Sequence, residues 1–474
     1  MTSPGAGRRT RHPVRIVHLG LGAFHRAHQA WYTQRANDVG SEGWGIHAFT
    51  GRTPDAAHAL SAQDCVYALI ERGPLADSAT LVESISAATD GADVARWRRA
   101  FEDPHLAIVT LTITEAGYRL GSTGTFDLGD GQVVADLVSL RAGEGAATAP
   151  ARLVDGLRAR RAAGGGAIAV VSCDNLPDNG GVIRTAVLAV AGEIDHSLAE
   201  WIGHTVSFVS TMVDRITPAT TPADVTEARA LTGFPDAVPV VAEPFSEWVL
   251  SGGFPAGRPD WHRVGARFVD DIVPFEQRKL WLLNAGHSLL AYRGLRRGHS
   301  TIAEAMLDDD CRAQVEELWS EARPVLPFDD REFDEALDAL RRRFGNARIE
   351  HRLLQIGTGG SQKLGPRVVD PIRRRLAVGL PVGRAQAAVI AAWAMHLGSV
   401  DRRDPATDEL ALSLSGASPE GAASAVLGFL APDLRDHLLE PVTAGIHALS
   451  ATELSVTEAE EVTEAEEVTE GSTT

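Results

Sequence analysis

The succession of strand-like and helix-like patterns is the sequence feature that most constrains the fold of this chain. Short runs rich in Val, Ile and Ala recur up to residue 269, separated by helical or glycine-rich stretches. Such alternation is typical of a parallel α/β sheet, whereas the pattern from Phe275 onward is almost wholly helical. We therefore predict an α/β domain followed by a mostly α-helical domain. The expected strands are 14–19, 45–50, 106–112, 167–172, 206–213, 238–242 and 264–269. The expected helices are 275–293, 301–322, 330–344, 384–398, 418–429 and 432–449.

The two ends of the chain differ in composition from its body. The 474 residues are 44% hydrophobic, which is enough material for two cores. Residues 452–470 contain eight glutamates and no basic residue, and without them the formal net charge changes from −18 to −10. We expect four segments, which are a disordered leader at 1–13, an α/β domain at 14–272, a helical substrate or catalytic domain at 273–450 and an acidic disordered tail at 451–474.

Charge and hydropathy exclude several classes of partner. A net negative body argues against binding to a phosphate backbone, so no nucleic acid is expected. No apolar run reaches the roughly 18 residues that a membrane helix needs. Residues 1–13 carry arginines but lack the apolar segment of a secretion signal. We therefore expect a cytoplasmic protein that acts on small molecules.

Lysine is almost absent from this chain. Only Lys279 and Lys363 occur, against forty-three arginines. A lysine ammonium can lose its proton when burial lowers its pKa, whereas arginine stays protonated. A lysine that acts as a base therefore cannot be replaced by arginine. Both lysines are candidates for chemistry, and the alternative is that they are chance survivors of a compositional bias.

The segment around Lys279 predicts a buried helix with a polar face. Residues 274–287 are rich in Leu, Trp and Ala and contain no breaker between the first proline and Gly286. At about 100° per residue, Glu276, Lys279, Asn284 and His287 fall within an arc of about 140°. Unpaired polar groups in a core cost about 1–3 kcal/mol each, so we expect these groups to find partners or to contact a ligand. A helix end exposed to water is the alternative.

A glycine-rich turn follows the first predicted strand. Gly20 and Gly22 precede a helical stretch, and this arrangement lets backbone amides and the helix dipole hold a pyrophosphate. His25 stands where G-x-G-x-x-G has its third glycine, so the pattern alone also fits an ordinary tight turn. No acid follows the second strand, where NAD-preferring proteins bind the ribose, and Arg52 lies there instead. Arg52 could accept the 2′-phosphate of NADP, so we expect relaxed use of NAD and NADP.

Metal and thiol chemistry have no ligand pattern in this sequence. The three cysteines Cys65, Cys173 and Cys311 are widely spaced, and the histidines form no H-E-x-x-H motif. We therefore expect reduced, inert thiols and no metal.

Several motifs resemble, in order, those of the mannitol dehydrogenase family of polyol-specific long-chain dehydrogenases. The resemblance spans roughly residues 14 to 450. In that family a substituted glycine fingerprint with Phe-His-Arg is usual, so His25 matches. The motifs are Gly-Leu-Gly-Ala-Phe-His-Arg-Ala-His at 20–28, Thr-Glu-Ala-Gly-Tyr at 114–118, Ser-Cys-Asp-Asn-Leu-Pro at 172–177, Val-Asp-Arg-Ile-Thr-Pro at 213–218, the helix with Lys279, Asn284 and His287, and Gly-Ser-Gln-Lys at 360–363.

The resemblance implies a metal-free NAD(P)-dependent oxidoreductase that interconverts a polyol and a 2-ketose of the mannitol/fructose type. Its α/β half would then be a Rossmann-like dinucleotide-binding domain, and the protein could be monomeric, as is frequent in this family. Fructuronate reductase and mannitol-1-phosphate 5-dehydrogenase stay open as alternatives. Hexitol dehydrogenases of this family tend to carry an arginine at the position of Gln355. With Gln355 there, the segment is closer to the fructuronate reductase branch. A dinucleotide-binding sensor without turnover is a more distant alternative.

The resemblance also implies a role for each matched residue. Asp214 could instead form a plain loop ion pair with Arg215. The implied catalytic residues are Lys279 as general acid/base, Asn175 and Asn284 as oxyanion donors and His287 as an orienter of sugar hydroxyls. The implied proton path is Glu276 and Asp214. The expected substrate contacts are Lys363, Arg352 and Gln355. The expected cofactor contacts are Gly20, Gly22, Phe24, His25, Arg52, Thr114 and Glu115.

Overall fold

The computed structural model describes residues 11–51, 53–121, 124–398 and 404–451. Internal contacts divide the chain into two compact units, Met1–Glu276 and Gln277–Thr474. Nearly all of the expected leader and acidic tail lies outside the described residues. Within the described residues, no helix is long and apolar enough to cross a membrane.

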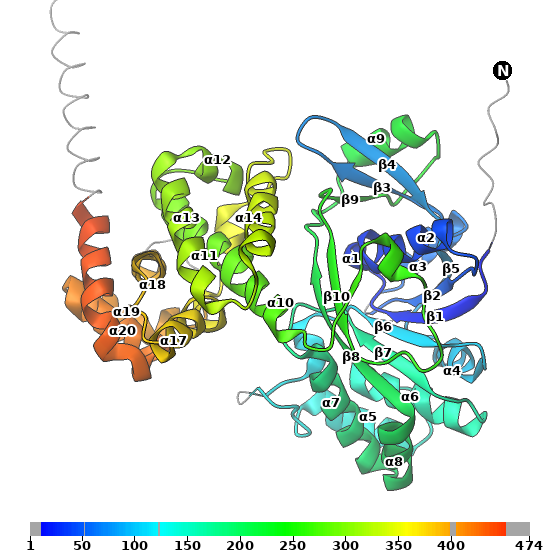
Figure 1. The fold of residues 1–474 in the computed structure, drawn as a ribbon. Coiled ribbons are helices and arrows are strands. Elements are labelled where there is room, and N and C mark those ends of the chain that lie inside the picture. Colours follow the sequence, from blue (N-terminus) through cyan, green and yellow to red (C-terminus); the bar gives the residue numbers. More distant parts are fainter. Residues whose placement is uncertain (1–10, 52, 122–123, 399–403, 452–474) are drawn as a thin grey trace, which may run out of the picture. The chain divides into compact units, whose positions relative to one another are not determined.

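The first unit is built on an eight-stranded sheet in which six parallel strands follow the order β5-β2-β1-β6-β7-β8 (Figure 1). This is the Rossmann strand order, whose direction of winding reverses between the first and fourth strands, here β1 and β6. Antiparallel β10 and short β11 extend the sheet beyond β8. The strands are β1 (Val14–Leu19), β2 (Gly45–Phe49), β5 (Ile85–Thr89), β6 (Ile108–Leu111), β7 (Ile168–Ser172), β8 (Val206–Asp214), β10 (Glu247–Ser251) and β11 (Arg267–Phe268).

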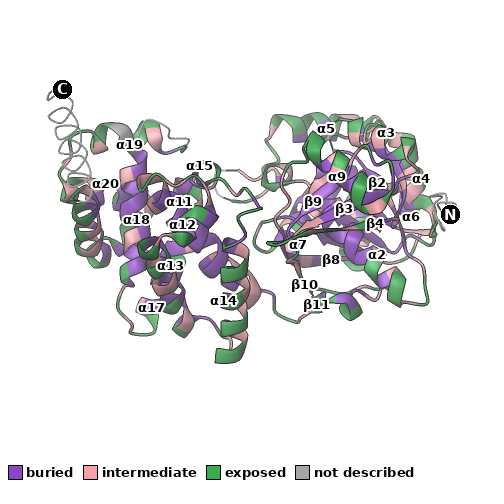
Figure 2. Ribbon diagram, turned by 90° about the horizontal axis from the view of Figure 1, so that it is seen from above, coloured by how far each residue is buried: buried purple, intermediate pink, exposed green. Residues whose placement is uncertain are grey.

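Helices cover both faces of this sheet, and each face has its own apolar core. One core contains Phe101, Leu153 and Ile183, and the other contains Leu60 and Trp248. In Figure 2 the buried strands lie between helices whose outer surfaces are exposed. One face carries α4 (Val94–Glu102), α5 (Gly131–Arg141), α6 (Ala149–Ala162), α7 (Asn179–Ile194) and α8 (His196–Thr205), and the other carries α1 (Ala23–Ala27), α2 (Gln29–Val39) and α3 (Asp55–Ala62).

A second, three-stranded sheet in this unit was not predicted. It has the order β4-β3-β9, and α9 (Pro222–Thr232) packs beside β3 and β4. Along β4 only the last residue is buried, so the strand has no apolar run that the sequence would reveal. β5 and β10 were also missed. The strands of the second sheet are β3 (Tyr67–Arg72), β4 (Asp77–Val82) and β9 (Val240–Ala242).

The second unit is helical, and this confirms the predicted fold class. Its two central helices, α11 and α18, are buried along most of their length (Figure 2). The expected helix 301–322 is interrupted at Asp308, and residues 345–383 hold helices that were not predicted. The helices are α11 (Ala285–Arg296), α12 (Ile302–Leu307), α13 (Asp309–Ala322), α14 (Asp330–Phe344), α15 (Leu353–Ile356), α16 (Gly360–Leu364), α17 (Asp370–Ala377), α18 (Arg384–Leu397), α19 (Thr407–Leu414), α20 (Pro419–Leu430) and a last helix at 435–451.

Candidate active site

The turn after β1 is a glycine loop at the carboxyl end of the sheet, held by backbone hydrogen bonds to Phe49. Gly20 has φ +107°, and a Cβ there would lie 2.0 Å from the carbonyl oxygen of Thr112. The amides of Gly20 and Leu21 both donate to the carbonyl of Phe49, at 2.9 and 3.0 Å. A Cβ on Gly22 would meet nothing nearer than 3.6 Å, so the space beside it is open. This loop lies at the β1/β6 reversal, where such sheets bind dinucleotides.

The residues that follow the glycines pack inward. His25 is fully buried and stacks on His18 of β1, with ring centroids 3.3 Å apart. Burial, and then the neighbouring His18, lower the pKa of His25 well below its usual value, so the ring is neutral. Phe24 is half-buried and stacks on His28, with centroids 5.1 Å apart. Arg52, the expected NADP contact, lies outside the described residues.

Asn175 is exposed directly after β7, on a turn that Asp174 holds in place. The buried Asp174 carboxylate accepts hydrogen bonds from the amides of Ile113 and Thr114 and from the hydroxyl of Tyr118, all at 2.8–3.1 Å. Burial raises the pKa of Asp174 against the opposing effect of these bonds. Asp174 thus ties the end of β7 to the loop after β6, a role that the sequence analysis missed although the motif contains the residue.

Thr114 and Glu115, two expected cofactor contacts, are exposed in the loop after β6. Thr114 has φ +64°, an uncommon backbone conformation for a threonine. It precedes a short 3₁₀ helix, η1 (Glu115–Tyr118). Both residues therefore lie beside the glycine loop at the carboxyl edge of the sheet, since β6 is the direct neighbour of β1.

The two expected proton-path acids belong to the first unit. Asp214 is the last residue of β8 and is only 9% exposed. Its neighbour Arg215 donates to Glu71 at 2.7 Å and to the carbonyl of Ala27 at 2.6 Å. Glu276 accepts the amide hydrogen of Asp178 at 3.0 Å, in the segment just after Asn175.

The helical run from Val273 to Arg296 is not a regular α-helix. Between α10 (Val273–Arg278) and α11 the residues Lys279–Asn284 form a π-helix, η3. Its i→i+5 bonding adds a residue to the turn, so the expected arc drawn at 100° per residue is wrong across this stretch. The indole of Trp319 donates to the carbonyl of Leu282 at 2.9 Å and satisfies a group inside the π segment. Single π turns occur frequently at functional sites.

Asn284 and His287 are buried, and each has a side-chain polar atom that makes no hydrogen bond within the described residues. They are 8% and 7% exposed. Among the described residues, Nδ2 of Asn284 and Nε2 of His287 have no hydrogen-bond partner. Burial, and then nearby His351 and Arg343, lower the pKa of His287 well below its usual value, so its ring is neutral. Such unpaired atoms cost about 1–3 kcal/mol each, and a ligand hydroxyl would satisfy them.

Arg367 is a further residue of this region that the sequence analysis missed. It lies in a second π-helix, η5 (Gly365–Val369), which packs against η3. Its guanidinium donates to Ser288 Oγ at 3.1 Å and to the carbonyl of Asn284 at 3.4 Å. Ser288 Oγ donates to the same carbonyl at 3.2 Å. Arg367 therefore fixes the backbone that carries Asn284, and only the packing of two distant segments reveals this.

The three expected substrate contacts lie near the start of α15 and in α16. Lys363 is half-buried and donates to the carbonyl of Thr358 at 2.6 Å. Its helix begins at Gly360, where a Cβ would lie 2.4 Å from the hydroxyl of Tyr292. Gln355 is exposed. Arg352 is also exposed and pairs with Glu350 at 3.1 Å.

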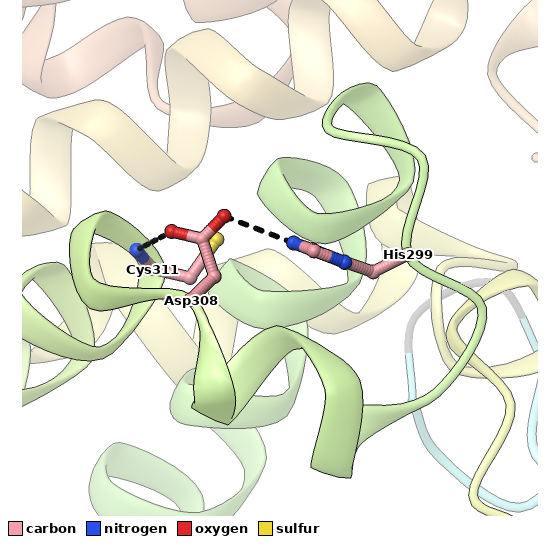
Figure 3. Close-up of side chains that lie close together, drawn as sticks. All are labelled: His299, Asp308 and Cys311. Atoms are coloured by element: carbon pink, nitrogen blue, oxygen red, sulfur yellow. Dashed lines mark hydrogen bonds and ion pairs between the residues drawn. The ribbon is translucent and has the colours of Figure 1, made fainter.

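A cluster of His299, Asp308 and Cys311 has the composition of a metal site but the bonding of a helix cap (Figure 3). Asp308 Oδ1 accepts the amide hydrogens of Asp310 and Cys311 at the start of α13, while Oδ2 accepts from His299 and Arg297 at 2.9 and 2.6 Å. Burial would raise the pKa of Asp308, but these hydrogen bonds outweigh that effect and lower it. Burial raises the pKa of the Cys311 thiol to about 11. The guanidinium on Asp308 repels a cation, so we assign the cluster a structural role.

Family models and known proteins match nearly the whole chain. The mannitol dehydrogenase Rossmann domain matches residues 14–263, and the mannitol dehydrogenase C-terminal domain matches residues 271–420. D-mannonate oxidoreductase of Escherichia coli (strain K12) is 38% identical over 404 residues, which are 83% of this chain and 82% of that relative. Polyol:NADP oxidoreductase of Gluconobacter oxydans (strain 621H) is 36% identical over 372 residues, 76% of each chain.

A solved structure is similar to this chain over most of its length. The ternary complex of Pseudomonas fluorescens mannitol 2-dehydrogenase with NAD and D-mannitol has a TM-score of 0.79 and 32% identity, covering 96% of this chain and 95% of that one. A Rossmann domain followed by a helical domain of this kind defines an oxidoreductase of the polyol dehydrogenase class. The chain belongs to the mannitol dehydrogenase family, which confirms the resemblance found in its motifs.

Proposed function

We propose that this enzyme interconverts a six-carbon polyol and its 2-ketose or the corresponding uronate, using a nicotinamide dinucleotide held at the Gly20–Gly22 loop. The observation that carries the proposal is the π segment in the second unit. It bears Lys279 and ends at Asn284, and His287 follows on α11 with a second buried atom that lacks a partner. The open space beside Gly22 fits a bound pyrophosphate, because a Cβ would narrow it.

The bound nicotinamide would accept or supply the hydride. Lys279 takes the hydroxyl proton in oxidation and returns it in reduction. The amides of Asn175 and Asn284 donate to the oxygen as negative charge develops, and each donor stabilises the transition state by about 3 kcal/mol. Neutral His287 bonds a further sugar hydroxyl. Glu276 and Asp214 would exchange the lysine proton with solvent.

The substrate residues favour a ketose that carries either a hydroxyl or a carboxylate. Gln355 bonds a neutral hydroxyl as readily as a carboxylate, whereas Arg352 and Lys363 supply positive charge. One relative named above is a D-mannonate oxidoreductase, which keeps the fructuronate alternative open. We expect Lys363→Ala to raise KM for the uronate more than KM for the neutral ketose.

The cofactor preference follows from Arg52 and from the missing acid after β2. Arg52 would pair with the 2′-phosphate of NADP, and one relative is named for NADP. We therefore expect use of both cofactors, with NAD modestly favoured. A preference for NAD beyond about a hundredfold in kcat/KM, equal to about 2.7 kcal/mol, would rule out this role of Arg52.

A substrate panel with NADH and NADPH tests the proposal. Reduction of fructose or fructuronate is the expected result. If both are inert while a phosphorylated hexose is reduced rapidly, the hexitol-phosphate alternative replaces it. If the protein binds NADH but reduces none of these sugars, the sensor alternative replaces it.

A further inference from the structure

A buried relay of three side chains lies directly beneath the glycine loop. His18, in β1, is fully buried between Thr110 and Thr112 of the neighbouring segment. Its Nδ1 lies 2.8 Å from Thr110 Oγ1, and its Nε2 lies 3.1 Å from Thr112 Oγ1. Thr112 Oγ1 in turn donates to the carbonyl of Gly20 at 2.8 Å. The relay therefore connects the interior of the sheet to the residue whose φ is +107°.

The hydrogen bond from Thr112 to Gly20 assigns the tautomer of His18 in this relay. A threonine hydroxyl has one proton, and Thr112 donates its own to Gly20. Thr112 must therefore accept from His18, whose Nε2 carries the hydrogen. In a neutral ring Nδ1 is then an acceptor, so it receives the hydroxyl proton of Thr110. Burial lowers the pKa of His18 to about 3, which keeps the ring in this neutral form at physiological pH.

The relay fixes the carbonyl group of Gly20 in the loop. The amide of Gly20 is held by Phe49, and its carbonyl is held by the Thr112 hydroxyl. Because both ends of Gly20 are bonded, the chain enters Gly22 and the first turn of α1 along a fixed direction. The stack of His25 on His18, 3.3 Å apart and 9° from parallel, holds that turn against the same ring.

We propose that His18 and Thr112 are positioning residues for the dinucleotide, acting through the Gly20 carbonyl on the loop that binds its pyrophosphate. This inference rests on the proposed function, because it requires a dinucleotide at that loop. Neither side chain needs to touch the ligand. Loss of the Thr112 hydroxyl frees the Gly20 peptide, and part of the binding energy is then used to order the loop.

Titration of the full-length protein with NADH, followed by its fluorescence, tests the inference without turnover. Thr112→Val removes the hydroxyl at nearly constant volume, and we expect Kd for NADH to rise about tenfold. Thr112→Ser restores the hydroxyl and should return Kd to within about twofold of wild type. Thr33→Val is the matched control, because it also removes a buried hydroxyl that donates to a backbone carbonyl, that of Gln29, but it leaves the bond to Gly20 and the ring of His18 unchanged.

The outcomes separate a positioning role from a general defect. A Thr112→Val protein that binds NADH as wild type overturns the inference, and so does a Thr33→Val protein that is weakened equally. Thr112→Ala removes the same hydroxyl without bulk and serves if the valine variant does not fold. If wild type itself binds neither NADH nor NADPH, the proposed function fails first, whereas normal wild-type binding with unchanged variants rejects only the relay.

Discussion

The glycine loop of the first unit and the π segment of the second differ in how their polar groups are satisfied. At the loop, the protein itself bonds both ends of Gly20 and both ring nitrogens of His18, although neither ring nitrogen of the buried His25, stacked on His18, has a partner among the described residues. At the π segment, the buried Asn284 and His287 each keep one atom without a partner among the described residues. The protein thus bonds the backbone of the loop at Gly20, whereas at the π segment it leaves one side-chain atom of Asn284 and one of His287 without a hydrogen bond.

The largest effect is expected at Lys279, where one substitution can keep the positive charge and remove the ability to release a proton. Lys279→Arg keeps the positive charge but cannot release a proton, so we expect kcat to fall about a thousandfold or more. Binding of NADH, measured by fluorescence titration, should stay near wild type because the glycine loop is unchanged. Retention of more than about a tenth of kcat would remove Lys279 from the role of general base.

Two buried asparagines test this contrast directly, because the side-chain amide nitrogen of one has no hydrogen-bond partner and the side chain of the other is bonded by the protein. Asn284→Ala should lower kcat/KM about a hundredfold while leaving the free energy of unfolding nearly unchanged, because no protein bond to its Nδ2 is lost. Asn179 is the matched control, since its side chain bonds the carbonyl of Asp174 and both backbone groups of Thr211 at 2.7–2.9 Å. Asn179→Ala should lower the free energy of unfolding by about 3 kcal/mol.

Chemical denaturation and steady-state kinetics of both variants give the answer. Equal destabilisation by the two substitutions would mean that Asn284 is a structural residue, and the contrast between the two regions would then fail.

The two glycines of the loop should separate stability from affinity. Gly20→Ala forces a Cβ to 2.0 Å from a backbone oxygen at a positive φ, so we expect a loss of about 3 kcal/mol or more in the free energy of unfolding. Gly22→Ala meets no such contact and should change stability by less than about 1 kcal/mol. Its new methyl group narrows the space beside the loop, so Kd for NADH should rise about tenfold. A Gly22→Ala protein with unchanged Kd would place the dinucleotide elsewhere.

The smallest effect concerns the pH dependence of stability. Burial, and then Arg343, lower the pKa of His351 to about 4 from the usual 6.5. Below pH 6.5 the unfolded chain binds a proton that the folded chain does not, so stability falls as pH falls through this window. His351→Gln should therefore reduce the slope of the unfolding free energy between about pH 6.5 and 4 by about 1.4 kcal/mol per pH unit.

Denaturant titrations at several pH values measure this slope. An unchanged slope in His351→Gln would show that this ring titrates alike in the folded and unfolded chains.

The sequence was most informative where one property of a residue was unusual. The central parallel strands were predicted because burial on both faces leaves continuous apolar runs, as in β7, which is buried at all five positions. β4 was missed because its residues are mostly exposed or half-exposed. Lys279 became a candidate because lysine is rare in this chain.

Features that depend on distant packing could not be predicted. A π turn has the same composition as an α turn, and here it is accompanied by a bond from Trp319, which lies on another helix. Arg367 reaches Asn284 only because the second π-helix packs against the first. Asp174 was passed over because its partners follow a different strand.

Deleting a residue from the π segment would affect the helix differently from substituting one. A chain shortened by one residue between Lys279 and Asn284 would form an unbroken α-helix with regular i→i+4 bonds, and its backbone would gain regularity. The deletion would remove the residue that the wide turn absorbs, so His287 would keep nearly its present rotational position relative to the preceding turn, while side chains inside the turn would shift. The extra residue is thus accommodated within the turn, at the expense of helical regularity.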